Sequence, residues 1–245
     1  MFILKSTNLV KTYAGRTVVN QVSYDVAEGE IVGLLGRNGA GKTTSFRMTV
    51  GMISPDAGQV IFNGQDVSRL PMYQRAQRGM GYLAQEPSVF QRLSVEDNLK
   101  AILETRPLNK AERLARAEAL MKQFDLFKNR HQQARTLSGG ERRKLEIARA
   151  LISEPSLILL DEPFAGVDPV AVEELQAEIR KLRDQLEISM LITDHNVHNV
   201  LAVCDRVYVI SQGQVFAEGT PKEIINNDAV RKTYLGSTFR GDEFD

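Results

Sequence analysis

The sequence predicts an α/β fold that carries a helical insertion, and three observations lead to this prediction. Continuous apolar runs at 31–35, 80–85, 157–162 and 189–195 are typical of central strands that are covered on both faces. Helical segments separate some of these runs, as expected for a parallel sheet. Residues 94–153, in contrast, contain no convincing strand. The chain of 245 residues can form one large domain or two small ones.

Short strands are expected in the N-terminal part. Residues 22–26 (VSYDV) alternate apolar and polar side chains, as a half-covered strand does. Residues 59–64 (QVIFNG) resemble an edge strand of a hairpin. The buried strand at 31–35 lies between them and leads into a glycine-rich loop and a helix from about Lys42.

The middle of the chain has three helix starts with the spacing of a capping box, in which two side chains cap each other's backbone N–H groups. They are Ser94–Asp97, Asn109–Glu112 and Ser138–Glu141. Residues 109–124 are also rich in residue types that favour helix. We therefore predict a single domain, in which a helical subdomain (91–154) is inserted between two parts of an α/β core (1–90 and 155–245).

The α/β pattern resumes after the insertion. A helix is expected near 169–186, a hairpin around Gly213, and a last helix that begins with Thr220, Pro221 and Glu223. The final residues, RGDEFD, are polar and are expected to be frayed.

Composition excludes several classes of protein. Lys and Arg together number 31, as do Asp and Glu, so the formal net charge is zero and gives no support for nucleic acid as a partner. The longest apolar runs are far shorter than the roughly 20 residues that span a bilayer, and the first residues lack the features of a signal peptide. The single cysteine, Cys204, fits a reducing cytosol, and its apolar neighbours indicate a buried structural side chain.

Residues 36–44, GRNGAGKTT, fit the phosphate-loop pattern G-x-x-x-x-G-K-[ST]. Glycines let backbone N–H groups turn toward phosphate oxygens, and the helix N-terminus adds the positive end of its dipole. Lys42 is expected to reach the β- and γ-phosphates, and Thr43 is expected to bind Mg²⁺. A plain glycine turn before a helix would not explain the Lys-Thr pair.

The strand at 157–162 ends in two acidic residues, at the edge where open α/β sheets bind ligands. Asp161 can complete the shell of Mg²⁺, and Glu162 can polarise a water molecule for attack on the γ-phosphate. Without the phosphate loop, both acids would be interpreted as solvated residues at a strand end.

Other polar residues have a functional interpretation but would each be structural on their own. Gln85 ends the strand at 80–85 and can contact Mg²⁺ or the attacking water. His195 follows another strand and can donate a hydrogen bond to the γ-phosphate. Tyr13 can stack on an adenine ring. The basic run 142–144 is expected to form a solvated helix face.

Taken in order, these residues resemble the nucleotide-binding subunit of ABC transporters along nearly the whole chain. The matching motifs are GRNGAGKTT as the phosphate loop, Gln85 as the Q-loop residue, LSGGE (137–141) as the signature motif, LILLDE (157–162) as the Walker B strand with its glutamate, GVD (166–168) as the D-loop, His195 as the switch histidine and Tyr13 as the adenine-stacking aromatic residue. Because all these motifs occur in the family's order, we interpret Gln85, His195 and Tyr13 as functional rather than structural residues.

The resemblance implies an α/β P-loop NTPase (RecA-like) core with an N-terminal antiparallel β subdomain and an inserted α-helical signature subdomain. The cofactors would be ATP and Mg²⁺. The catalytic residues would be Glu162, His195 and Gln85, and the metal ligands Thr43, Gln85 and Asp161. The nucleotide would be bound by Tyr13, Gly36, Arg37, Asn38, Gly39, Ala40, Gly41, Lys42, Thr43, Thr44, Ser138, Gly139, Gly140 and Asp168.

The signature motif also implies a quaternary structure. In a head-to-tail dimer, Ser138, Gly139 and Gly140 of one copy would contact the γ-phosphate that the other copy holds. A glycine-rich helix start in a separate helical lobe cannot easily reach the phosphate of its own chain, whereas a two-fold dimer brings it to the partner's phosphate twice.

A narrower resemblance is to the ATPases of lipopolysaccharide-export transporters of Gram-negative bacteria, and it is carried by residues 81–99, 135–151, 159–169, 191–197 and 234–240 (YLGSTFR). It implies a peripheral ATPase on the cytoplasmic face of the inner membrane, bound to two permease subunits that dock near Pro87–Leu93. Phe90 would be an apolar contact there or, equally, a core residue. Lipopolysaccharide would be transported without binding this subunit directly.

Three alternatives to this function are weaker. The ATPase of another transporter, such as a branched-chain amino-acid importer, is disfavoured by the YLGSTFR ending. A soluble ABC ATPase that works on ribosomes or DNA would be expected to carry two cassettes or a long coiled-coil insertion. A non-catalytic regulator is disfavoured by the presence of Glu162 and His195.

Overall fold

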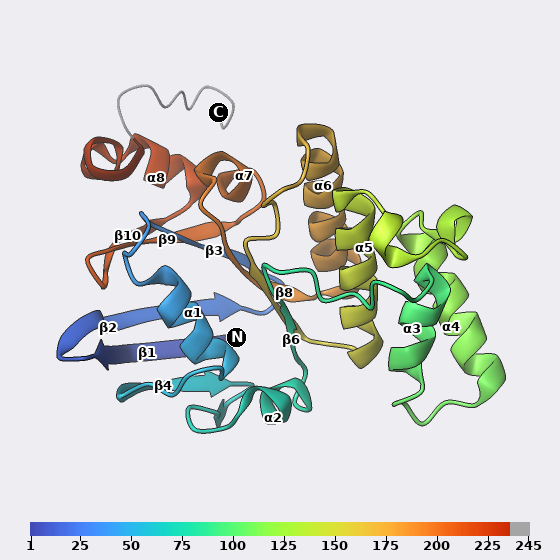
Figure 1. The fold of residues 1–245 in the computed structure, drawn as a ribbon. Coiled ribbons are helices and arrows are strands. Elements are labelled where there is room, and N and C mark those ends of the chain that lie inside the picture. The colour runs from blue at the N-terminus through green and yellow to red at the C-terminus, as the bar shows by residue number, and fades with distance from the viewer. Residues whose placement is uncertain (236–245) are drawn as a thin grey trace.

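The chain folds into two β-sheets with helices packed around them, as a computed structural model that describes residues 1–235 shows. Figure 1 shows the antiparallel sheet at one side of the molecule and the helices α3 and α4 at the other, with the parallel sheet between them. The polar end RGDEFD and residues 236–240 of YLGSTFR lie outside the described residues. Among those described, no helix combines the length and apolarity needed to cross a bilayer.

The smaller sheet has four antiparallel strands in the order β2-β1-β4-β5, formed by Arg16–Ala27, Phe2–Tyr13, Ala57–Phe62 and Gln65–Asp66. The larger sheet has the order β10-β9-β3-β8-β7-β6, formed by Gln214–Gly219, Arg206–Ser211, Ile31–Leu35, Ser189–Thr193, Leu157–Asp161 and Met80–Leu83. Neighbouring strands of this sheet are parallel to each other, except that β9 and β10 form an antiparallel hairpin. The predicted α/β class is confirmed.

The helices are α1 (Lys42–Val50), α2 (Met72–Ala76), α3 (Val95–Leu103), α4 (Lys110–Gln123), α5 (Gly139–Ala150), α6 (Pro169–Leu186), α7 (Val197–Leu201), α8 (Pro221–Asn226) and α9 (Asp228–Val230). Shorter helical turns lie between or after these helices, at Phe127–Asn129, Ala134–Thr136, Leu151–Ser153 and Arg231–Leu235. The predicted capping boxes at Asn109–Glu112 and Ser138–Glu141 are both formed, and Ser94 caps α3 through the Asp97 N–H group.

Two hydrophobic cores lie on opposite faces of the parallel sheet. Alternate residues of β3 enter different cores: Ile31 and Leu35 face the helices α5 and α6, whereas Val32 and Leu34 face α1 and the antiparallel sheet. The second core includes Phe46 of α1, so the helix after the phosphate loop is packed between the two sheets. Cys204 is buried in the first core, as predicted.

Some N-terminal expectations were wrong or incomplete. The strand β4 is not an edge strand, because β1 pairs with one side of it and the two-residue β5 with the other. The long strand β1 gave no clear signal, since its buried residues do not follow strict alternation and Asn8 adopts a left-handed conformation with φ 50°. The short helices α2 and α7 were also missed, and each spans little more than one turn.

Two arginines join these layers, one buried and one half-buried. Arg75, which is 1% exposed, donates hydrogen bonds to the carbonyl oxygens of Met48 and Thr49, at the end of α1, and to those of Ser68 and Leu70. The positive charge therefore lies at the negative end of the α1 dipole. Burial lowers the pKa of Arg75 to about 10, a value at which the guanidinium remains charged at neutral pH.

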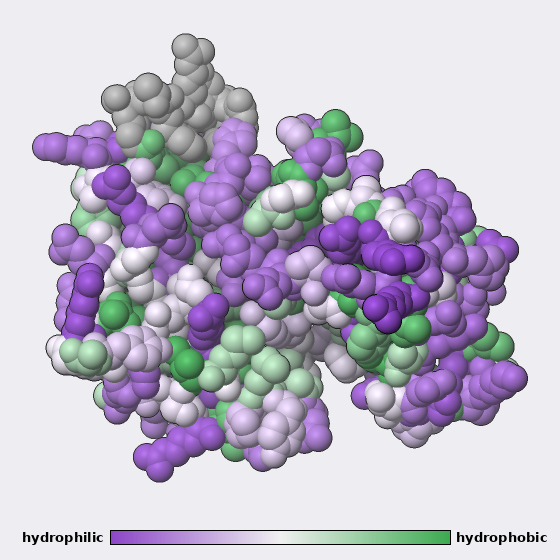
Figure 2. Space-filling view, in the orientation of Figure 1, coloured by the Kyte–Doolittle hydropathy of each residue, from purple (hydrophilic) through white to green (hydrophobic). Residues whose placement is uncertain are grey.

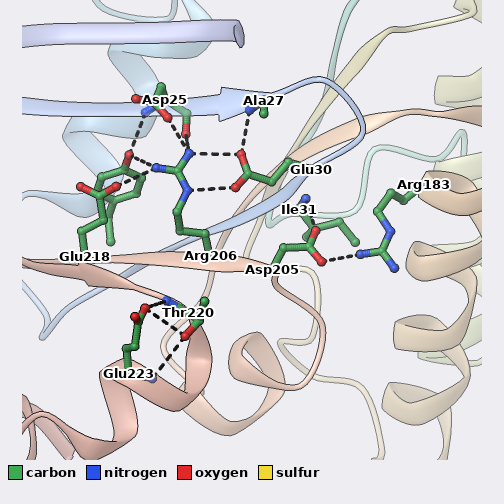
Figure 3. A network of polar contacts seen from close by, with 11 residues as sticks. Asp25, Ala27, Glu30, Ile31, Arg183, Asp205, Arg206, Glu218, Thr220 and Glu223 are labelled. Atoms are coloured by element: carbon green, nitrogen blue, oxygen red, sulfur yellow. Dashed lines mark hydrogen bonds and ion pairs between the residues drawn. The ribbon is translucent and has the colours of Figure 1, made fainter. Parts of the chain in front are cut away.

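The second arginine, Arg206, ties the parallel sheet to the antiparallel one. Figure 3 shows its guanidinium group between the carboxylates of Asp25, Glu30 and Glu218. Asp25 belongs to β2, and Arg206 begins β9, so the cluster crosses from one sheet to the other. Burial raises the pKa of Glu30, but hydrogen bonds from Arg206 and from the Ala27 N–H group outweigh it and hold this pKa below 4.5.

We expect Arg206→Ala to lower the free energy of unfolding by about 2 kcal/mol, because three carboxylates lose a charged hydrogen-bond donor. Lys122→Ala, which removes an exposed ion pair with Glu118, serves as the control and should cost at most about 0.5 kcal/mol. Urea unfolding measures both losses of unfolding free energy.

Because the pKa of Glu30 is lowered in the folded state, the contacts of the Glu30 carboxylate stabilise the fold at neutral pH. This stabilisation is lost as the pH falls below 4.5. A gap between wild type and Arg206→Ala that did not narrow in acid would contradict this assignment.

Candidate functional site

The predicted site residues follow the carboxyl ends of four neighbouring parallel strands. Leu34 of β3 is opposite Thr193 of β8, Thr193 is opposite Asp161 of β7, and Leu160 is opposite Leu83 of β6. The loops that follow these strands therefore leave the sheet at the same edge. Ligands of open α/β sheets bind at this edge.

The phosphate loop connects β3 to α1 and is held by backbone contacts. Gly36 has φ 151°, and a Cβ atom there would lie 2.2 Å from the carbonyl oxygen of Ile210. Gly41 caps α1 in a left-handed conformation with φ 104°. The Gly213 N–H group, in the β9–β10 turn, donates to the carbonyl oxygen of Ala40 at 2.9 Å. The hairpin that was predicted around Gly213 thus holds the phosphate loop in place through this hydrogen bond.

Lys42 is 6% exposed and turns back into the phosphate loop. Its ammonium group donates hydrogen bonds to the carbonyl oxygens of Gly36 and Arg37. Burial lowers the pKa of Lys42, and the nearby carboxylates of Glu162 and Asp194 act in the opposite direction. The lysine therefore lies between the loop and the acidic end of the sheet.

A cavity of about 370 Å³ opens beside the phosphate loop. Its walls are residues 37–40 of the loop, the turn at Ser211–Gly213, Arg16–Val18 at the start of β2, and Thr233. Tyr13 lies opposite Arg16 in the β1–β2 pairing and is 47% exposed, but it does not line the cavity. The Lys11 ammonium group lies 5.6 Å from the centre of its ring. The predicted stacking role of Tyr13 thus remains a prediction.

Asp161 is the last residue of β7 and is 4% exposed. Burial raises the pKa of its carboxyl group, and the positive charge of Arg47 on α1 opposes that shift. The hydroxyl group of Tyr82 lies 3.5 Å from the Asp161 Oδ2 atom. A carboxylate at this depth is stabilised by any cation that approaches it.

The three predicted catalytic residues meet at one oxygen atom. Glu162 Oε2 accepts a hydrogen bond of 2.7 Å from the Gln85 Nε2 atom and lies 3.3 Å from His195 Nδ1. Glu162 has φ 46°, and its N–H group donates to the Thr193 carbonyl oxygen. This turn of the backbone brings the Glu162 side chain between the loops that follow β6 and β8.

The signature residues lie at the start of α5, beside the start of α6. Ser138 caps α5 through the Glu141 N–H group, and the Glu141 carboxylate accepts from the Ser138 N–H group. Ser138 and Gly139 are exposed, whereas Gly140 is buried. A Cβ atom on Gly140 would lie 2.8 Å from the Ala171 Cβ atom of α6. At least one glycine of this motif is therefore required by packing within its own chain.

Asp168 is the N-cap of α6 and accepts a hydrogen bond from the Ala171 N–H group at 3.1 Å. Pro169 occupies the first turn of α6, and the helix expected near 169–186 is confirmed. The described contact of Asp168 is thus structural, and its role toward nucleotide remains a prediction.

The basic run 142–144 is not a solvated face, which corrects the sequence interpretation. Arg143 is 6% exposed and forms a buried ion pair with Glu146. Arg142 donates to the Leu137 carbonyl oxygen, and Lys144 pairs with Glu174 of α6 at 2.7 Å. The sequence could not reveal this burial, because the loop after β6 that covers Arg143, and whose Ala84 carbonyl oxygen it binds, is distant in the sequence.

Asp194 was not predicted as a site residue. It directly follows β8, is 1% exposed, and accepts hydrogen bonds from the N–H groups of Phe164 and Asn196. Burial raises its pKa. An acidic residue at the end of a buried strand was the signal that identified Asp161, and the same signal applies to Asp194.

Comparisons with known proteins agree with this geometry. The sequence model of the ABC transporter family matches residues 19–165. The lipopolysaccharide export system ATP-binding protein LptB of Escherichia coli K12 is 53% identical over 241 residues, which cover 98% of this chain and 100% of that protein. The protein of the same name from Haemophilus influenzae is 49% identical over 241 residues, with the same coverage of both chains.

Solved structures give the same fold. An ATP-binding cassette of an ABC transporter in its ADP conformation has a TM-score of 0.85 and 28% identity, covering 97% of this chain and 100% of that one. CbiO1 from Clostridium perfringens has the same TM-score and identity and covers 96% of each chain.

A second sequence model, for branched-chain amino acid ATP-binding cassette transporters, matches residues 214–240. This range includes the YLGSTFR ending. The ending therefore does not argue against that class of transporter, contrary to our expectation from the sequence.

We expect Gly36→Ala to lower the free energy of unfolding by roughly 3 kcal/mol, because the added Cβ atom meets the backbone of β9. Gly39→Ala is the matched control within the same loop: φ is 78°, but no atom lies within 4 Å of the added Cβ. Its cost should be the backbone strain alone, about 1 kcal/mol. Urea unfolding of the two variants tests this difference, and equal losses would show that contact with Ile210 is unimportant.

Proposed function

The chain belongs to the ATP-binding subunits of ABC transporters, and on that premise we propose that it hydrolyses ATP to drive the export of lipopolysaccharide from the inner membrane. The observation that carries the proposal is the meeting of Gln85, Glu162 and His195 beside the phosphate loop. Identity of about half over the full length of two lipopolysaccharide-export ATP-binding proteins supports the choice of substrate.

ATP would bind with its phosphates in the loop of residues 36–44, where Lys42 exchanges the loop carbonyls for phosphate oxygens. The Thr43 hydroxyl, the Gln85 amide oxygen and the buried Asp161 carboxylate are the hard oxygen ligands that Mg²⁺ prefers. The metal, when bound, would neutralise charge on the β- and γ-phosphates.

Glu162 would act as the general base. Its carboxylate accepts a proton from a water molecule while the water oxygen bonds to the γ-phosphorus and the bond to the ADP oxygen breaks. Gln85 and His195 both reach the same oxygen of Glu162, so they would orient the carboxylate and the water. His195 could then donate a hydrogen bond to the γ-phosphate.

The second half of each site would come from another copy of the chain. Ser138 and Gly139 are exposed at the start of α5, which makes a hydroxyl group, backbone N–H groups and the positive end of a helix dipole available to an anion. Loss of the γ-phosphate on hydrolysis would weaken this contact and open the dimer.

Two permease subunits would dock near Pro87–Leu93 on the cytoplasmic face of the membrane. Phe90 is 44% exposed, so it is not a core residue, and the Arg149 guanidinium lies 4.6 Å from the centre of its ring. Asn98, fully buried, holds the segment through both the N–H and the carbonyl group of Phe90. Figure 2 shows a hollow between the α/β body and the helical lobe.

We expect Glu162→Gln to lower the rate of ATP hydrolysis by about 1,000-fold and to trap an ATP-bound dimer, because the amide cannot accept the proton from water. Size-exclusion chromatography with ATP and Mg²⁺ detects the dimer, and phosphate release measures the rate. Wild-type turnover by this variant would remove Glu162 from the role of base.

The double variant Glu162→Gln/Ser138→Arg is the control for the shared site. It should bind ATP as a monomer with the affinity of Glu162→Gln but form no dimer, since the arginine would occupy the partner's γ-phosphate position. Loss of monomer binding as well would show that Ser138 acts on the nucleotide of its own chain.

The ATPase of a branched-chain amino-acid transporter is the second candidate, and the match of residues 214–240 favours it. Purification of the chain with its membrane partners separates the two functions. Under the main proposal, we expect the co-purified permeases in vesicles to make ATP hydrolysis respond to added lipopolysaccharide and not to leucine. A response to leucine alone would assign the chain to amino-acid transport.

A further inference from the structure

A buried ion pair joins the signature helix to the loop that carries Gln85. The Arg143 Nη1 atom donates to the carbonyl oxygen of Ala84, the residue before Gln85, at 2.9 Å, and to Glu146 Oε2 at 2.8 Å. Glu146 Oε1 accepts from the Ser88 N–H group at 2.6 Å. Both side chains lie on one face of α5 and hold the loop at two points.

A third hydrogen bond joins α5 to the same loop. The Arg149 Nη1 atom donates to the Ser88 carbonyl oxygen at 2.7 Å. Residues 143, 146 and 149 are each three apart, so they lie along one side of the helix. The loop after β6 is therefore fastened along α5 over two turns.

The pair is unusual because it is costly to bury. Arg143 and Glu146 side chains are 7% and 4% exposed. The Nε and Nη2 atoms of Arg143 make no hydrogen bond with the described residues. Buried ion pairs are often no more stabilising than apolar residues of the same size, whereas removing one partner is strongly destabilising. Stability alone thus gives little reason for this pair.

The position of the Arg143–Glu146 ion pair in the fold explains its presence better than stability does. A cavity of about 240 Å³ lies between the start of α5 and the catalytic residues, with Gln85, Glu162, Gly139 and Gly166 among its walls. Arg143 and Glu146 also line it. The polar contacts of Arg143 and Glu146 thus join α5 to the Gln85 loop at the wall of this cavity.

We propose that Arg143 and Glu146 are positioning residues, which hold the signature residues Ser138–Gly140 at a defined distance from the Gln85 loop of the same chain. If this distance changes, Ser138 and Gly139 meet the partner's nucleotide less well, so dimerisation and turnover would both fall. The inference rests on the proposed ATPase function and on the shared site.

The test uses the full chain with Glu146→Leu, which removes the acceptor for Ser88 and the partner of Arg143. We expect the turnover rate to fall about tenfold, and the ATP concentration that dimerises the Glu162→Gln background to rise about tenfold, as for the loss of one charged hydrogen bond. The affinity of the monomer for a fluorescent ATP analogue should stay within about twofold. Glu146→Gln, which keeps the size and an acceptor for Ser88, should recover most of the lost rate.

Two further variants separate positioning from folding. Glu174→Gln breaks the pair with Lys144 on the same helix and should change nothing. Arg143→Met/Glu146→Leu removes both charges and should unfold near the wild-type temperature, yet hydrolyse ATP as slowly as Glu146→Leu. A folded double variant with wild-type turnover would overturn the proposal, as would a loss of monomer affinity in step with turnover. A wild-type chain without ATPase activity would instead refute the proposed function.

Discussion

The common end of four parallel strands is the constraint on which the site depends. The register of β3, β8, β7 and β6 puts the phosphate loop, His195, Glu162 and Gln85 at the same edge, although they come from distant parts of the sequence. Side chains alternate between faces along a strand, so a slip of one residue would move Asp161 to the other face of the sheet. Such a slip would also exchange the side chains that fill the two close-packed cores.

Local patterns in the sequence were sufficient to predict the features that depend on residues close together in the chain. The central strands, the capping boxes of α4 and α5, and the turn from β3 into α1 each depend on neighbouring residues, and these were predicted correctly. The burial of Arg143 depends on Ala84, 59 residues away, and was predicted wrongly. The meeting of Gln85, Glu162 and His195 lies between these cases: each residue was found by its strand end and by resemblance, but only the register of the sheet shows that they share one oxygen atom.

Arginines with several partners recur where two parts of the molecule join. Arg206 links the sheets, Arg75 holds the end of α1 against the segment before α2, and Arg143 links α5 to the loop after β6. Each reaches partners that are far apart in sequence, and Arg75 and Arg143 bind carbonyl oxygens at the end of α1 and in the loop after β6. A planar guanidinium with five N–H groups suits this task, because it can serve several acceptors in fixed directions.

The contacts of Lys42 have a consequence for how nucleotide is captured. Its ammonium group is already hydrogen-bonded to the loop that would receive the phosphates, and the loop itself is closed by the β9–β10 turn. The conformational entropy of ordering the loop is thus lost when the protein folds and not when ATP arrives. Capture of nucleotide then requires only that one set of oxygen acceptors replaces another around a fixed cation, so an empty subunit is ready to reload as soon as ADP leaves.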